Sequence, residues 1–138
     1  MISKRCSRIY DQHLKLLEPS LLKHLRENEV VPELHLTRWL RCVMSREYSI
    51  ENTLLMWDFI LHGASQLDHA KLIQQEELLL NEPAQDPFIN LEFISCAMVI
   101  LIKEELMECD FSMCLGLLMS YKEPDSALSV IKKAVRIR

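Results

Sequence analysis

The stretch ELHLTRWLRCVMSREYSIENTLLMWDFIL, residues 33–61, has the clearest pattern in the chain. It holds both tryptophans, and each lies beside a charged residue, in Arg38-Trp39 and in Trp57-Asp58. Such a stretch is either a site that carries out chemistry or a core that holds other elements in place. The helical pattern within it and the residues around it distinguish these two interpretations.

Two helices joined by residues 45–49 are predicted from this stretch. The first runs from Pro32 to about Ser45, because four apolar residues recur at the spacing of one helical face: Leu36, Trp39, Leu40 and Val43. The second begins after Ser49, a favourable N-cap, and ends at Gly63, a C-cap candidate. Its apolar stripe, which we expect to point inward, comprises Ile50, Leu54, Trp57 and Leu61.

The two tryptophans are therefore expected to lie on facing stripes across a tight turn. The structural signature comprises the aromatic pair and the charges that flank it: Arg38, Trp39, Arg46, Glu47, Trp57 and Asp58. A charge at the edge of an apolar junction is costly unless it is paired. We expect Asp58 to accept hydrogen bonds from Arg38 or Arg46. A core clamp is favoured over direct contact with a ligand.

The 138 residues are predicted to form one all-α domain of six or seven helices. Apolar residues make up 49% of the chain, which argues against disorder, and two glycines are too few for a phosphate-binding glycine loop. The other predicted helices are Ser3–Leu17, Pro19–Glu27, a central one after Pro87 that is apolar on nearly all faces, Phe111–Tyr121 with Asp110 as N-cap, and a last one with Leu128, Ile131 and Val135 inward. Residues 64–90 are expected to hold an insertion or a flexible segment, with a short helix at Leu67–Leu80.

Charge is uneven along the chain, whose net charge is −4. Both ends are basic, which we interpret as solvated helix ends rather than a nucleic-acid or lipid site. The residues are Lys4, Arg5 and Arg8 at the start and Lys132, Lys133, Arg136 and Arg138 at the finish. Five cysteines without a CxxC pair indicate reduced thiols in a cytosolic protein. We expect neither a signal peptide nor a membrane-spanning segment.

No catalytic group can be assembled from the sequence. None of the five histidines lies at helical spacing from a cysteine with an acidic third partner, and no close ligand pair suggests zinc. The thiol pair Cys109 and Cys114 is more plausible as core packing than as a nucleophile. We therefore expect no catalytic residue, no metal and no cofactor.

The stretch LTRWLRCVMSREYSIENTLLMWDFI resembles the R-W…R-E-F…W-D signature of TBC domains, the Rab GTPase-activating domains. Tyr48 stands where the family usually has Phe. Residues 16–34 resemble the family's D-P-x-L-x-x-H-L segment, and residues 95–138 resemble the end of the domain in its endosomal, retromer-associated branch. The resemblance covers most of the chain apart from about residues 64–90.

The resemblance implies the all-helical C-terminal half of a TBC domain. TBC domains supply an arginine from I-x-x-D-x-x-R and a glutamine from Y-x-Q-G to the GTPase, and both motifs belong to the N-terminal half. This chain has no I-x-x-D-x-x-R. Tyr10-Asp11-Gln12 matches Y-x-Q literally, but His13 replaces the glycine and a helix surrounds it, so we reject the match.

We therefore expect the chain itself not to be an enzyme, with the two fingers lying outside it in a fragment, an isoform or a partial gene model. The implied partners are a Rab-family small GTPase, bound through the full domain, and an endosomal coat protein. The implied location is the cytoplasm, peripheral to endosomal or other vesicle membranes. The alternatives are a stand-alone helical adaptor without GTPase-activating function and a small thiol enzyme.

Overall fold

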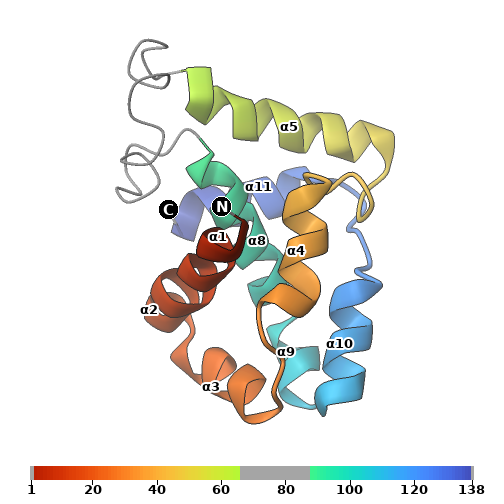
Figure 1. Cartoon of the computed structure of the whole chain (residues 1–138). Coiled ribbons are helices and arrows are strands. Elements are labelled where there is room, and N and C mark those ends of the chain that lie inside the picture. Colours follow the sequence, from red (N-terminus) through yellow and green to blue (C-terminus); the bar gives the residue numbers. More distant parts are fainter. Residues whose placement is uncertain (1, 66–87, 138) are drawn as a thin grey trace.

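The computed structural model describes residues 2–65 and 88–137, and every regular element in these ranges is a helix (Figure 1). The all-α prediction is confirmed, with eight helical stretches in the described residues rather than six or seven. The predicted insertion at 64–90 falls mainly on residues 66–87, and the predicted helix Leu67–Leu80 falls entirely there; both lie outside the described residues. No helix in the described ranges is long and apolar enough to cross a bilayer.

The first helical stretch is continuous from Ile2 to Leu17. It comprises α1 (Ile2–Arg8), the wider π-helical turn η1 (Ile9–Leu14) and α2 (Lys15–Leu17). Glu18 leaves the helical conformation, as the residue before a proline tends to do, and α3 (Pro19–Glu27) follows with Pro19 in its first turn. Both stretches agree closely with the predicted bounds.

Helix α4 (Glu33–Arg41) ends earlier than predicted, with Cys42 as its C-cap. The backbone N–H of Met44 donates to the carbonyl of Trp39 at 2.9 Å, and that of Val43 donates to Leu40 at 3.3 Å, which is the Schellman pattern. Val43 and Met44 therefore adopt positive φ angles of 49° and 64°. Glycine usually occupies this position, and a β-branched Val43 there stores backbone strain. The turn needs other contacts to hold it.

Helix α5 (Ile50–Ser65) begins as predicted, because the Ser49 hydroxyl accepts from the backbone N–H of Asn52 at 3.4 Å. Two other predictions about α5 are wrong. Gly63 lies within the helix and does not end it. The stripe expected to point inward is exposed, with Ile50 at 77% and Trp57 at 37%, and likewise Leu54 and Leu61. The buried face carries Thr53, Met56 and Ile60 instead.

Helix α8 (Ile89–Leu101) is the centre of the fold, as predicted, and almost all of its residues are buried. It contacts η1, α4, α5, α9 (Lys103–Met107) and α11 (Leu128–Ile137), the last more extensively than any other helix. Helix α10 (Phe111–Met119) is capped by Asp110, whose carboxylate accepts from the Met113 N–H at 3.0 Å. That cap was predicted from the sequence.

Helix α11 presents a different face to the core from the one predicted. Val130 and Ala134 are fully buried, whereas Leu128 and Val135 are 49% and 58% exposed, and Ile131 is partly buried. The core-facing positions of α11 are therefore Val130 and Ala134, and Ile131 packs at the edge of the core.

Candidate functional site

Trp39 lies near the end of α4, beside the turn that leads to α5. Its side chain is fully buried and meets the Tyr121 ring edge-on, with 5.5 Å between ring centroids. The His35 ring meets Trp39 at 4.8 Å, also edge-on. The Tyr121 hydroxyl donates to the carbonyl of Met98 in α8 at 2.8 Å. Trp39 therefore joins α4 to the C-terminal segment and to the central helix.

Trp57 acts differently from the expectation. Among the described residues no ring contact joins the two tryptophans, and the indole N–H of Trp57 donates to the Val43 carbonyl at 2.8 Å. The acceptor, Val43, is the strained residue of the Schellman turn. Trp57 therefore stabilises the turn from its exposed side, whereas the buried Trp39 packs on its inner side. The expected facing pair of tryptophans is wrong because α5 turns its other face to the core.

The charges of the signature are also arranged differently. Asp58 is exposed, and within the described ranges it pairs with neither Arg38 nor Arg46. Arg38 Nε lies 3.7 Å from Glu47 Oε1, an ion-pair distance that is too long for a hydrogen bond. The predicted Asp58 pair is thus replaced by Arg38–Glu47. Arg46 is exposed at the surface of the turn.

Glu47 is a buried acid whose carboxylate has few polar partners. Its side chain is 2% exposed, and neither carboxylate oxygen accepts a hydrogen bond within the described residues. Burial raises its pKa, and the Arg38 charge opposes that rise. The neighbouring Tyr48 hydroxyl and the Trp39 indole N–H are likewise buried without a partner there. The turn therefore carries buried polar atoms that add no stability of their own.

The C-terminal segment latches the start of α5. Glu123 accepts from the Ser49 backbone N–H at 2.8 Å and from the Asn52 side chain at 3.1 Å. The Asn52 carbonyl oxygen accepts in turn from the Ala127 backbone N–H at 2.9 Å. These hydrogen bonds lower the pKa of Glu123, the Ser49 bond most. These hydrogen bonds join residues about 75 positions apart and hold the start of α5 against the C-terminal segment.

A second buried polar cluster was missed by the sequence reasoning. Glu92 in α8 is fully buried and accepts from Arg5 Nη1 at 2.7 Å and from Arg8 Nε at 2.7 Å, with a further bond from Arg8 Nη2. His13 Nε2 lies 3.1 Å from the same carboxylate. The predicted solvated helix end is therefore wrong for Arg5 and Arg8, which are 6% and 7% exposed. The available signal was a single acid in an apolar helix, which requires a buried cation.

No reactive constellation accompanies these clusters. Burial lowers the pKa of His35 to about 3 and raises that of Cys6 and Cys114 to about 11, so these groups are neutral near pH 7. The Cys109 and Cys114 thiols donate to backbone carbonyls. No group of three metal-ligating side chains occurs in residues 2–65 and 88–137.

The geometry is that of a helical scaffold built around the 33–61 stretch. The profile of the Rab-GTPase-TBC domain matches residues 2–75, which are more than half of the chain. The chain belongs to this family. The human TBC1 domain family member 5 is 26% identical over 137 residues, which are 99% of this chain and 15% of that protein. The mouse TBC1 domain family member 13 is 25% identical over 137 residues, 99% of this chain and 28% of that protein.

A third relative, the TBC1 domain family member 5 homolog A of Dictyostelium discoideum, is 24% identical over 139 residues, and this chain covers 10% of it. This TBC chain thus spans between a tenth and less than a third of the relatives named. No solved structure matches it.

The literal Y-x-Q of this TBC chain lies inside η1, as the sequence indicated. Tyr10 is fully buried, where its hydroxyl donates to the Val30 carbonyl at 3.1 Å and lies 3.0 Å from His35 Nε2. Gln12 is exposed on the helix surface. Tyr10 is thus a core residue, and the short motif does not form a loop.

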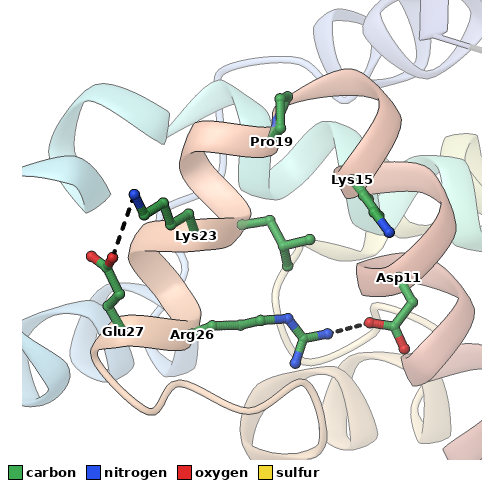
Figure 2. Close-up of a pocket in the computed structure, with 7 residues that line it drawn as sticks. Asp11, Lys15, Pro19, Lys23, Arg26 and Glu27 are labelled. Carbon is green, nitrogen blue, oxygen red and sulfur yellow. Dashed lines mark hydrogen bonds and ion pairs between the residues drawn. The ribbon is translucent and has the colours of Figure 1, made fainter.

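A groove of about 700 Å³ lies beside this segment, between the first helical stretch and α3 (Figure 2). Figure 2 shows Arg26 reaching across it to Asp11, and the guanidinium also lies 5.8 Å from the centroid of the Tyr10 ring. Lys23 and Glu27 form a weak surface pair at 3.8 Å. Arg26 is therefore held within the chain by an acid and a ring.

Proposed function

We propose that the chain is the C-terminal supporting part of a TBC-type Rab GTPase-activating domain. It holds the helical fold and supplies part of the surface that faces a Rab-family small GTPase. The arginine and glutamine that act on the nucleotide come from residues outside these 138. The match to the Rab-GTPase-TBC domain carries the proposal.

The contacts of the arginines support this role. Arg5 and Arg8 pair with the buried Glu92, Arg26 pairs with Asp11, and Arg38 lies beside Glu47. A catalytic arginine must reach the transferring phosphoryl group from an exposed position. Arg5 and Arg8 are buried, and Arg26 and Arg38, although partly exposed, each already lie beside an acid of this chain.

The alternative is a helical adaptor that binds partners without a GTPase. The exposed apolar residues of α5, with Ile50 at 77%, Leu54 at 54% and Leu61 at 54%, favour a binding role of some kind. We also propose, from the resemblance to TBC domains, an endosomal coat protein as a partner and a cytoplasmic location at the periphery of endosomes.

Binding to nucleotide-loaded Rabs separates the two functions. A panel of Rabs loaded with a GTP analogue, and the same panel loaded with GDP, is titrated into the chain by biolayer interferometry. The proposal predicts binding to at least one Rab with preference for the GTP form. Absence of binding to every Rab by both the chain and its full-length parent would support the adaptor instead.

A further inference from the structure

A groove between α9 and α10 lies at the end of the molecule opposite to α5 (Figure 1). Its volume is about 620 Å³, and its apolar lining includes Met113 and Leu117, which are 59% and 36% exposed. Gly116 lies between them on the same side of α10, and nothing is found within 4 Å of the position that a Cβ would take there. The missing side chain therefore leaves open space in the groove.

The rim of this groove is acidic. Glu105 and Glu108 line it and are exposed. The nearest cation in the sequence, Lys103, is drawn away to Glu18, with Nζ and Oε2 2.6 Å apart. Neither rim acid has an ion pair in the part of the chain that the structure describes. The groove thus combines an apolar floor with uncompensated negative charge.

We propose that this groove binds a basic amphipathic helix of a partner protein. The apolar floor takes the partner's leucine-like side chains, spaced one helical turn apart, and the rim takes its lysines or arginines. Exposed methionine suits such a site because its unbranched side chain adapts to different partners. Binding at this groove does not depend on the proposed GTPase-facing role.

Other occupants fit less well. Membranes and nucleic acids are negatively charged and are repelled by the acidic rim. A peptide that binds by strand addition needs a sheet edge, and residues 2–65 and 88–137 contain no strand. A second copy of this chain is the main competitor, because the outer side of α11 carries Lys132 and Val135.

The probe is a fluorescein-labelled helical peptide of about 18 residues, long enough to form a helix in water, with leucines on one face and lysines beside them. Its twin carries glutamate in place of every lysine. Fluorescence anisotropy with the full chain is predicted to give at least about tenfold tighter binding of the basic peptide, which is about 1.4 kcal/mol. The preference should shrink as salt rises from about 0.05 to 0.5 M, because ions screen the rim charges.

Gly116→Leu places a side chain in the groove from a position where a Cβ has nothing within 4 Å, and it is predicted to weaken binding at least about tenfold. Ser7→Leu, the same kind of change at an exposed position of α1, is the matched control and should bind as the parent does. The double variant Glu105→Lys, Glu108→Lys should prefer the acidic twin. Thermal melting of each variant verifies that it is folded.

Cys109 offers a readout at the site itself, because it lines the groove and is partly exposed. In a Cys42→Ser background, the bound basic peptide should slow the alkylation of Cys109 by a maleimide. Equal binding of the two peptides, or unchanged binding to a folded Gly116→Leu variant, would overturn the proposal. The unmodified chain could instead form dimers that Gly116→Leu abolishes and that the peptide does not displace. That result would overturn the proposal in favour of a second copy of the chain.

Discussion

Replacing Glu92 by glutamine tests whether the buried ion cluster holds the first helix on the core. The change keeps the shape of the side chain but removes the charge that Arg5 and Arg8 share. Removing one partner of a buried ion pair typically costs about 3–5 kcal/mol. A domain of this size is stable by roughly 5–15 kcal/mol in total. Because each kcal/mol moves the melting temperature of a domain of this length by about 3–4 °C, we expect a fall of about 10–20 °C.

Circular dichroism measures the melting of the Glu92→Gln variant and the parent. Glu104→Gln, an exposed acid on α9, is the matched control and should change the stability by no more than about 0.5 kcal/mol. Arg8→Gln should cost at least about 1 kcal/mol less in the Glu92→Gln background than in the parent, because the two residues share one interaction. Melting of Glu92→Gln within about 2 °C of the parent would refute the reasoning.

Three further changes test the signature turn. Trp39→Ala should cost about 3–5 kcal/mol in urea unfolding, because the ring is fully buried; a cost below about 1 kcal/mol would contradict its central place. Trp57→Phe should cost only about 0.5–1.5 kcal/mol, the value of its bond to the Val43 carbonyl, and a cost like that of Trp39→Ala would mean a buried role. Burial raises the pKa of Glu47, so the folded state binds its proton more tightly, and stability is lost as pH rises through that pKa. Glu47→Gln should therefore have a higher free energy of unfolding than the unmodified chain near pH 7. That free energy should rise less for Glu47→Gln than for the unmodified chain when the pH is lowered to about 5. The control Glu51→Gln, at an exposed position, should show neither difference.

The helix positions could be predicted because their signals are local. Pro19, the Ser49 cap and the Asp110 cap each mark a boundary within a few residues of the chain, and each is found in the structure. Two boundaries are exceptions. Gly63 was expected to end α5 but lies within it, and α4 ends earlier than expected. Val43 occupies a left-handed position that usually takes glycine, so the sequence carries no sign of the turn there.

The inward faces of α5 and α11 could not be predicted from periodicity alone. Helix α5 carries apolar residues on more than one face, so both the Ile50–Leu54–Trp57 stripe and the Thr53–Met56–Ile60 face fit the helical period. In α11 Val130 is fully buried whereas Val135 is 58% exposed, so the same residue type lies on both faces. Hydrophobicity alone therefore does not decide which face meets the core.

The ion pairs depend on contacts between distant residues. Glu92 is separated from Arg8 and Arg5 by 84 and 87 positions in the sequence, so no local pattern predicts the pairing. The same holds for the latch from Glu123 to Ser49. The Arg38–Glu47 pair is closer in sequence, but the choice between Glu47 and Asp58 depended on the orientation of α5.

The central claim is that this TBC chain supports GTPase activation without supplying the groups that act on the nucleotide. A single-turnover assay of GTP hydrolysis across a panel of Rabs tests it most directly, with the chain in molar excess and the full-length parent protein in parallel. The account predicts that every Rab hydrolyses GTP at its intrinsic rate in the presence of the chain, including a Rab that the parent accelerates. Acceleration of any Rab by the 138 residues, abolished by Gln12→Ala or by replacement of an exposed arginine such as Arg46, would contradict it.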